Sequence, residues 1–171
     1  MYDADDTVDL LSDDRRFSEH GSLLPAEDSL RNEEMEVVER TFAANDEMLH
    51  KAIAFVEENL ELHEAAMKAI MAITVSLEEM FVNVAHYAYP DSDGDVKIVI
   101  GFEGDNVEIT LIDEGIPFDP LAKEDPDVHA SAQERNIGGL GIYMVKNSMD
   151  YCSYERKDGK NIFCMRRNIR K

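Results

Sequence analysis

The sequence predicts an α+β fold, a two-layer α/β sandwich in which a mixed, mostly antiparallel sheet is covered on one face by helices. Segments typical of strands and helices follow in the order strand, two helices, two strands, loop, helix, two strands. Grouped strands and helices of this kind are typical of a sheet with helices on one side. Turns of only two or three residues join the strands of the two later pairs, which predicts antiparallel hairpins.

The first 34 residues differ in composition from the rest of the chain. They hold eleven acidic and three basic residues without a regular hydrophobic pattern. Such a segment buries too little apolar surface to fold, so residues 1–34 are expected to form an acidic, mostly disordered extension. The composition changes at Met35, and the compact domain is expected to span residues 35–171. Its first strand is predicted at residues 35–42, where apolar and polar positions alternate.

Two helices are expected after this strand. Asn45, followed by Asp46 and Glu47, is typical of a helix start. The second helix is expected from about residue 63 to Pro90, where the proline and the DSDGD segment end it. Because this second helix is apolar nearly all round, we expect it to be buried. The first helix is amphipathic, with one apolar face made by Leu49, Ile53, Val56 and Leu60.

The second half of the chain begins with two strands. Residues 96–102 and 106–113 alternate apolar and polar positions and predict an antiparallel pair. Residues 114–137 contain three prolines, and connections of that length inside a compact domain are usually functional. The glycine-rich GGLG then opens a last helix, residues 141–150, and a hairpin over residues 151–167 closes the domain.

The two cysteines lie on either side of this closing hairpin. If Asp158 and Gly159 form its turn, Cys152 opposes Met165 and Cys164 opposes Ser153. The thiols then point to opposite faces of the sheet, so no disulfide is expected. Free cysteines are consistent with a reducing compartment, and we expect a cytoplasmic protein.

The charge of the chain excludes some partners. The formal net charge is −20 over 171 residues. Such a surface repels phosphate backbones, so no nucleic acid is expected as a partner, whereas a basic protein would be attracted. No stretch approaches the roughly 20 apolar residues of a membrane span, and the acidic start lacks the basic region of a signal peptide. No membrane association is expected.

Four residues of the second helix stand out against its apolar sequence. Glu79, Asn83, His86 and Tyr87 are spaced to project from one stripe. Burying an unpaired carboxylate or amide is costly, so the stripe needs either partners inside the protein or a ligand. The residues alone leave both readings open.

Two further clusters are ambiguous when taken singly. In IDEGIPFDP, Asp113 ends a strand and Gly115 permits a sharp turn, which is an ordinary loop feature. The GGLG segment can point backbone N–H groups at an anion, or it can simply be a tight turn. The chain has no P-loop motif, no GxSxG, no HExxH and no CxxC, so hydrolase and zinc functions have no support. The other histidines, His20, His50, His63 and His129, are scattered and expected to be solvated.

Taken in order, these three clusters resemble the N, G1 and G2 boxes of the Bergerat-type (GHKL) ATPases. Within this superfamily, the sequence is most similar to the anti-sigma factor serine/threonine kinases of bacterial partner-switching systems, over about residues 36–168. The resemblance implies ATP and Mg²⁺ as ligands. It also implies that Asn83 ligates Mg²⁺, that Glu79 is the general base, and that Asp113 accepts a hydrogen bond from the adenine amino group. Gly115 would let the purine edge come close.

The resemblance further implies a phosphate site and a lid. Backbone amides of Gly138, Gly139, Leu140 and Gly141 would bind the phosphates. Residues 116–137 would form the lid, with Arg135 touching the γ-phosphate. In one respect the sequence departs from the family, which commonly has histidine four residues after the asparagine. Tyr87 occupies that place here and His86 precedes it, so a role for His86 stays open.

The function implied by the resemblance is that of a cytoplasmic ATP-dependent protein serine/threonine kinase in transcription regulation. Its substrate would be a STAS-domain anti-sigma factor antagonist, a sigma factor would be a second partner, and homodimers would form through the sheets. Two alternatives stay open. One is a nucleotide-gated binding module without phosphotransfer, which Glu79 disfavours. The other is the catalytic domain of a sensor histidine kinase, although the typical dimerisation helices are missing.

Overall fold

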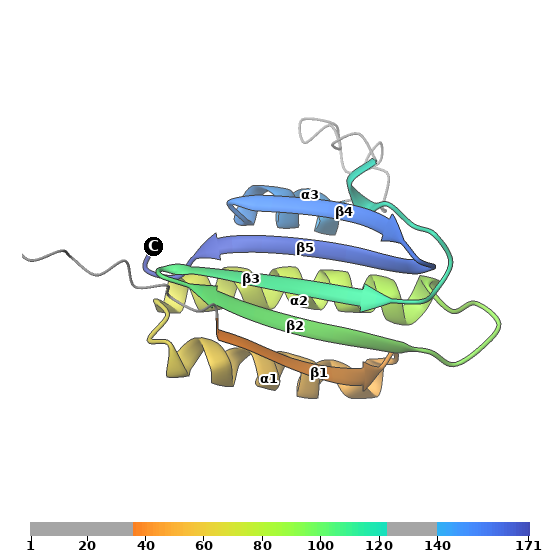
Figure 1. The fold of residues 1–171 in the computed structure, drawn as a ribbon, viewed down its shortest axis with the longest axis horizontal. Coiled ribbons are helices and arrows are strands. Elements are labelled where there is room, and N and C mark those ends of the chain that lie inside the picture. Colours follow the sequence, from red (N-terminus) through yellow and green to blue (C-terminus); the bar gives the residue numbers. More distant parts are fainter. Residues whose placement is uncertain (1–35, 123–139) are drawn as a thin grey trace, which may run out of the picture. The chain divides into compact units, whose positions relative to one another are not determined.

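The computed structural model of the chain describes residues 36–122 and 140–171. In this part of the chain a single sheet is backed by three helices, as Figure 1 shows. The elements are β1 (Glu36–Ala43), α1 (Asp46–Leu62), α2 (Met67–Tyr87), β2 (Asp95–Glu103), β3 (Asn106–Asp113), the 3₁₀ turn η1 (Pro120–Ala122), α3 (Leu140–Ser148), β4 (Tyr151–Lys157) and β5 (Lys160–Asn168).

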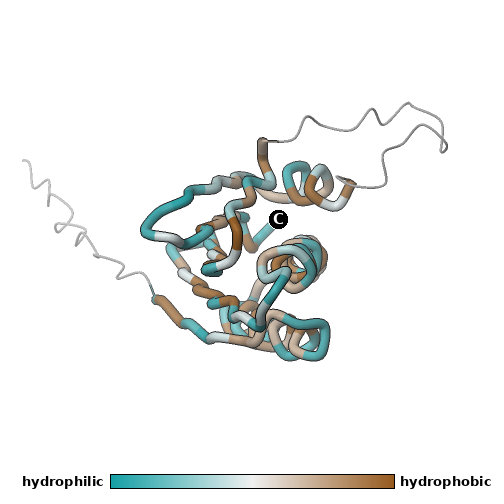
Figure 2. Tube along the Cα trace, turned by 90° about the vertical axis from the view of Figure 1, so that its right-hand side faces the viewer, coloured by the Kyte–Doolittle hydropathy of each residue, from teal (hydrophilic) through white to brown (hydrophobic). Residues whose placement is uncertain are grey.

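The strands are arranged in the order β1-β2-β3-β5-β4, and every neighbouring pair is antiparallel. The predicted fold class is confirmed, but the expected mixed sheet is wrong in detail, because the described strands form no parallel ladder. The connection through α3 does make β4 parallel to β3. However, the closing hairpin places β5 between them, so the two parallel strands never pair. Figure 2, which views the domain end-on, shows the helices on one side of the sheet.

The core lies between the sheet and the helices. Alternate side chains of a strand point to opposite faces, so every second residue of β2 and β3 faces the helices. These residues are at most 6% exposed. They pack against buried residues of α1 and α2 such as Val56, Leu60 and Phe81. The helix-facing residues of the two central strands are Val96, Ile98, Ile100, Phe102, Val107, Ile109 and Leu111.

The first two helices begin in different ways, α1 at a side-chain cap and α2 after a turn. The side chain of Asn45 accepts a hydrogen bond from the Met48 N–H at 3.2 Å, which confirms the predicted cap of α1. The expected start of α2 at about residue 63 is wrong, since α2 begins at Met67. Glu64 has a φ of 54°, and the N–H of Ala66 donates to the Ile169 carbonyl instead of continuing a helix.

Helix α2 is less buried than its composition predicts. Eight of its residues are buried, but Met67, Met71 and Val75 are 69%, 63% and 43% exposed. The expectation that no stretch has the length and hydropathy of a membrane span is also wrong, because α2 meets both criteria. Core helices of soluble proteins often do so as well, and α2 packs one face on the sheet.

The closing hairpin has the predicted register. Cys152 pairs with Met165 and Cys164 with Ser153, and both cysteines are free. Burial raises the pKa of the Cys152 thiol to about 11 and also raises that of Cys164. Both thiols are therefore protonated at neutral pH, which disfavours a nucleophilic role.

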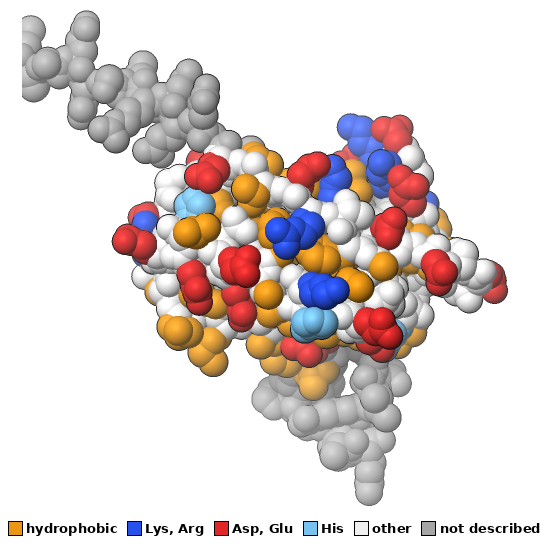
Figure 3. All heavy atoms as spheres, turned by 90° about the horizontal axis from the view of Figure 1, so that it is seen from below, with side chains coloured by type: hydrophobic (Ala, Val, Ile, Leu, Met, Phe, Trp, Pro, Cys, Tyr) orange, Lys and Arg blue, Asp and Glu red, His pale blue; other side chains and the backbone are white. Residues whose placement is uncertain are grey.

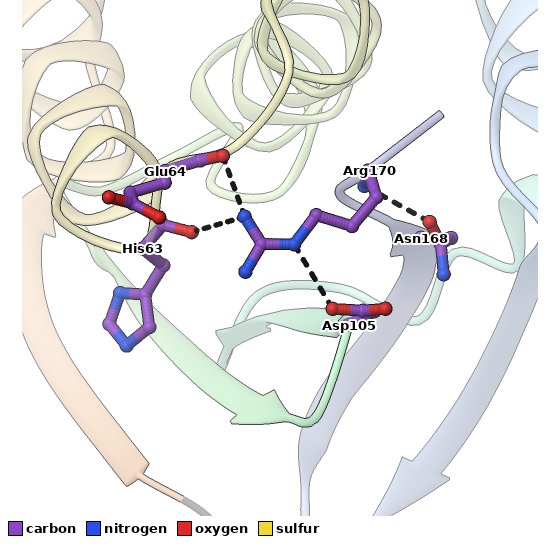
Figure 4. Close-up of polar contacts among 5 residues, drawn as sticks. All are labelled: His63, Glu64, Asp105, Asn168 and Arg170. Atoms are coloured by element: carbon purple, nitrogen blue, oxygen red, sulfur yellow. Dashed lines mark hydrogen bonds and ion pairs between the residues drawn. The ribbon is translucent and has the colours of Figure 1, made fainter.

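At one end of the sheet, Arg170 joins three segments that are distant in the sequence (Figure 4). Its Nε donates to Asp105 Oδ1 at 3.0 Å, and its Nη1 donates to the carbonyl of Glu64 at 2.8 Å. Beside it, the ring of His63 stacks on Phe102 with 3.5 Å between centroids. The expectation that His63 is solvated is therefore wrong, because its side chain is only 25% exposed. We call Glu64, Asp105 and Arg170 the clasp.

Candidate functional site

A cleft lies at the opposite end of β3 from the clasp, where the C-terminal half of α2 meets the ends of β3 and β5. It measures about 430 Å³, including the part that is open to solvent. The polar groups in its wall include Asn83 from α2, Asp113 from β3 and Asn161 from β5. An apolar cleft with a few convergent polar groups is the usual form of a small-ligand site. Its apolar lining includes Met80, Val84, Leu111, Ile116, Phe118 and Phe163.

Asp113 is the last residue of β3 and is only 6% exposed. Its Oδ1 atom accepts two hydrogen bonds, from the Gly115 N–H at 2.9 Å and from Asn161 Nδ2 at 2.7 Å. No described residue donates to its Oδ2 atom. One carboxylate oxygen is thus held by the protein, while the second is left to accept a hydrogen bond from a ligand.

Asn161 holds Asp113 in this orientation and was missed in the sequence. Besides donating to Asp113, its Nδ2 donates to the Ile116 carbonyl at 3.0 Å. Its Oδ1 accepts from the Tyr154 hydroxyl at 2.8 Å. The available signal was strand alternation, since Asn161 shares the inward face of β5 with Phe163. A polar residue at an inward strand position needs a partner or a ligand.

Gly115 is required by close packing against the end of α2. A Cβ atom at this position would lie 2.4 Å from the carbonyl oxygen of Ala88. The same carbonyl accepts a hydrogen bond from the Ile116 N–H at 2.8 Å, and Arg156 Nη1 donates to the Gly115 carbonyl at 2.9 Å. The segment after β3 is therefore fixed against α2. Its approach to a purine, which the family resemblance implies, stays a prediction.

Glu79 and Asn83 lie one helical turn apart on α2, and both are half-buried. No hydrogen bond joins either side chain to another residue in the described ranges. The sequence left open whether these polar side chains have partners inside the protein or bind a ligand. The described residues provide no such partners. An amide that lines the cleft and a carboxylate one turn before it, both without partners among the described residues, are available to a ligand.

The first turn of α3 lies against Glu79. A Cβ atom at Gly141 would be only 1.9 Å from Glu79 Oε2, so a side chain here would displace the carboxylate. Leu140 and Gly141 begin α3, and their N–H groups belong to the positive end of the helix dipole. Arg135, Gly138, Gly139 and most of the expected lid lie outside the described residues, so their predicted roles are untested.

His86 and Tyr87 diverge at the end of α2. Tyr87 is 61% exposed and lines the cleft. His86 is not a lining residue. Its Nε2 atom lies 2.8 Å from Oδ1 of Asp46 in the first turn of α1. The four residues expected in one stripe therefore do not all face the cleft. His86 instead contacts Asp46 and so links α2 to α1.

Tyr89 supports the rim of the cleft. Its hydroxyl donates to the Asp95 carbonyl at 2.7 Å and accepts from the Glu114 N–H at 2.9 Å. Burial raises the pKa of this hydroxyl, and the negative charge of Asp113 raises it further. The phenol therefore stays protonated at neutral pH and connects the segments before β2 and after β3.

Comparison with known proteins assigns the chain to a family. Residues 42–167 match the family described as histidine kinase-like ATPase domain. Over 92 residues the chain is 27% identical to the serine-protein kinase RsbW of Bacillus cereus strain B4264. It is 26% identical over 92 residues to RsbW of Bacillus mycoides strain KBAB4. Each alignment covers 52% of this chain and 58% of the relative, so the chain spans little more than half the length of these curated relatives.

A solved structure shows the same fold. The RsbU and RsbW domains of Rv1364c from Mycobacterium tuberculosis match with a TM-score of 0.57 and 17% sequence identity. The match covers 78% of this chain and 32% of that chain. At this identity the likeness concerns the fold alone. The family match, which covers most of the domain, confirms the predicted superfamily: this chain belongs to the histidine kinase-like ATPase domain family.

Proposed function

We propose that this protein binds ATP with Mg²⁺ in the cleft and transfers the γ-phosphate to a serine or threonine of a STAS-domain protein. The observation that carries this proposal is the layout of the cleft wall. A carboxylate held through one oxygen lies at the end of β3, and the Asn83 amide lies on α2 without a described partner. One turn before Asn83, the Glu79 carboxylate lies against the start of α3, also without a described partner. The names of the relatives as serine-protein kinases support the reaction class.

The purine would bind at the buried end of the cleft. Asp113 Oδ2 would accept a hydrogen bond from the adenine amino group, while Asn161 and the Gly115 N–H keep Oδ1 in place. A buried acceptor that needs this partner rejects bases without an amino group. The apolar walls, such as Met80 and Ile116, would cover the faces of the ring.

The phosphates would lie toward Asn83, Glu79 and the start of α3. Mg²⁺ prefers oxygen ligands and is often held by one or two protein groups together with substrate phosphates. The described residues contain no group of three or more His, Cys, Asp or Glu side chains placed to hold a metal ion. A site in which Asn83 provides one ligand and the phosphates provide others would not need such a cluster. Bound Mg²⁺ would neutralise the charge that develops on the phosphates.

Glu79 would act as general base. Its carboxylate would accept the proton of the substrate hydroxyl as the hydroxyl oxygen bonds to the γ-phosphorus and ADP leaves with the electrons of the broken P–O bond. Leu140 and Gly141, together with Gly138, Gly139 and Arg135 outside the described residues, are proposed to bind the phosphates. In a chain with a net charge of −20, these local groups must overcome repulsion of ATP by the overall field.

The regulatory part of the proposal is a competition between partners. The STAS-domain antagonist would be the substrate and a sigma factor the second partner, in the cytoplasm, with nucleotide state altering the relative affinities. Homodimerisation is also proposed, because β1 is an edge strand of the sheet. Val37 on this strand is 48% exposed, so a second sheet could pack or pair there.

The test compares two neighbouring glutamates. Glu79→Gln is expected to reduce phosphotransfer to a STAS-domain protein by about 100-fold or more, since general-base catalysis contributes on the order of 10²–10⁴. Glu78→Gln removes the same charge from an exposed position and should leave the rate unchanged. Transfer would be measured with radiolabelled ATP and Mg²⁺, and nucleotide binding by calorimetry. ATP binding should persist in both variants.

The same assay separates the alternatives. A wild-type protein that binds ATP but transfers no phosphate to STAS-domain proteins would be a nucleotide-gated binding module. A phosphorylated product that is labile in acid would indicate transfer to histidine and a sensor-kinase relative. Either result would contradict the serine/threonine kinase proposal.

A further inference from the structure

The exposed row on α2 is not explained by the nucleotide site. Met67, Met71 and Val75 are spaced four residues apart, so they form one line of about 12 Å along the outside of the helix. They are 69%, 63% and 43% exposed, although the opposite face of α2 is buried against the sheet. We call these three residues the methionine row.

Exposed apolar side chains also occur on the two helices that contact α2. Leu62, at the end of α1, is 79% exposed, and Met144 on the adjacent helix α3 is 44% exposed. Single exposed apolar residues are common, but contiguous patches above about a few hundred Å² mark interaction sites. Methionine is flexible and polarisable, and it is frequent on surfaces that bind apolar helix faces.

Carboxylates border the methionine row. Thr74 Oγ1 donates to Glu57 Oε1 at 3.3 Å, which places this glutamate of α1 beside the row. Glu61 follows one turn later on the same side of α1, and Glu64 lies in the turn before α2. Glu78 follows Val75 by three residues on the exposed side of α2, while Lys68 is the basic residue among them. Figure 3 shows the adjoining face of α1 and β1, where acidic side chains are spread around a few Lys and Arg side chains.

We propose that the methionine row is a docking site for a basic amphipathic helix of another protein. An apolar strip bordered by carboxylates complements a helix that has Leu-type residues on one face and Lys or Arg beside them. The row would contact the apolar face, and the glutamates would pair with the flanking cations. This proposal does not depend on phosphotransfer.

Charge also decides against the other occupants. Residues 1–34 of the same chain carry eleven acidic and three basic residues, so the acidic border repels them. A second copy of the domain would bring two acidic borders together. An anionic membrane surface would be repelled for the same reason, despite the apolar composition of α2. A basic protein segment is the occupant that both the apolar row and its border favour.

The first test uses the full chain with its methionine methyl groups labelled with carbon-13. The probe is a synthetic amphipathic Leu/Lys peptide of about five helical turns, at about 150 mM salt to screen non-specific attraction. The methyl signals of Met67 and Met71 are expected to shift on titration, whereas those of the buried Met149 and Met165 should not. Shifts confined to other parts of the protein would overturn the proposal.

The second test measures affinity in matched variants. Met67→Gln/Met71→Gln is expected to weaken peptide binding by about tenfold or more, because two contacting side chains become polar. The control Tyr151→Gln changes an apolar residue that is similarly exposed but belongs to β4, at the sheet edge opposite to β1. Melting temperatures should match the wild type for all variants. Equal affinity in the methionine variant, or an equal loss in the control, would refute the docking site.

Two further probes test the nature of the occupant. An otherwise identical Leu/Glu peptide should bind at least about tenfold more weakly than the Leu/Lys peptide, because it meets the acidic border. Phosphatidylcholine vesicles, with and without phosphatidylserine, should not bind the protein. If the acidic peptide binds equally well, or if vesicles bind through the methionine row, the assignment to a basic helix is wrong.

Discussion

Polar groups are paired with one another at one end of the sheet, whereas several at the other end have no partner among the described residues. At the clasp, Arg170 donates to Asp105 and to backbone carbonyls, and the turn before α2 is held by a bond to the C-terminal segment. At the other end, Asn83 in the cleft and Glu79 one turn before it make no hydrogen bond to any residue in the described parts of the chain, and Asp113 uses only one of its two oxygens. Polar groups that satisfy one another stabilise a fold, whereas half-buried groups without partners indicate a ligand. Substitutions at the two ends should therefore have opposite consequences.

Asp113→Asn should have the largest effect on the cleft. The amide oxygen can still accept from Gly115 and Asn161, which leaves an NH₂ group facing the cleft where the carboxylate presented an acceptor. ATP affinity is expected to fall by about 100-fold, because one buried hydrogen bond is lost and two donors face each other. Calorimetry would measure this loss. Unfolding in urea should change little, and a large loss of stability would mean that Asp113 is mainly structural.

Gly141→Ala should move the Glu79 carboxylate without changing Glu79 itself. Its methyl group must displace the Glu79 carboxylate, which lies at the end of a flexible side chain, so the fold should survive. We expect phosphotransfer to fall by about tenfold, since a small misplacement of a catalytic group is costly. Steady-state kinetics with a STAS-domain substrate would show it. An unchanged turnover number would indicate that the observed place of Glu79 is unimportant for the reaction.

Gly115→Ala should affect both stability and binding. Its Cβ would overlap the carbonyl oxygen of Ala88, and neither backbone segment can move freely. Overpacking of this kind costs about 1–3 kcal/mol of unfolding free energy. Gly159→Ala provides the contrast, because its φ of 79° strains alanine in open space, away from the cleft. Urea denaturation should show losses in both variants, with weaker ATP binding only at Gly115.

Arg170→Ala should have the smallest effect and should spare the cleft. The guanidinium and Asp105 are both substantially exposed, so solvent screens their ion pair, and we expect a loss of about 1 kcal/mol. Lys171→Ala, at the exposed adjacent position, is the control. ATP affinity should be unchanged in both variants. A change in ATP affinity at Arg170 would show that the two ends are coupled.

Local signals in the sequence predict much of this fold. Asn45 marks the start of α1 because its side chain caps the helix, and the two-residue turn sets the pairing of Cys152 with Met165. Each of these features depends on residues close in sequence. The same holds for the alternation in β2 and β3, which a half-buried strand requires.

Features that depend on distant segments were harder to predict. The turn before α2 depends on a hydrogen bond from Ala66 to Ile169, and the fully antiparallel sheet depends on β5 lying between β3 and β4. Asn161 joins the site only because its strand pairs with the one that carries Asp113. The exposure of Met67 and Met71 likewise follows from the position of α2 among its neighbours. Composition alone does not show which face of an apolar helix stays uncovered.

The most direct test of the account is a crystal structure of the protein with Mg²⁺ and a non-hydrolysable ATP analogue. We expect the adenine amino group within hydrogen-bond distance of Asp113 Oδ2, with Asn161 still bonded to Oδ1, and the phosphates beside Asn83. An analogue bound elsewhere, or a cleft in which Asp113 makes no contact with the base, would contradict it.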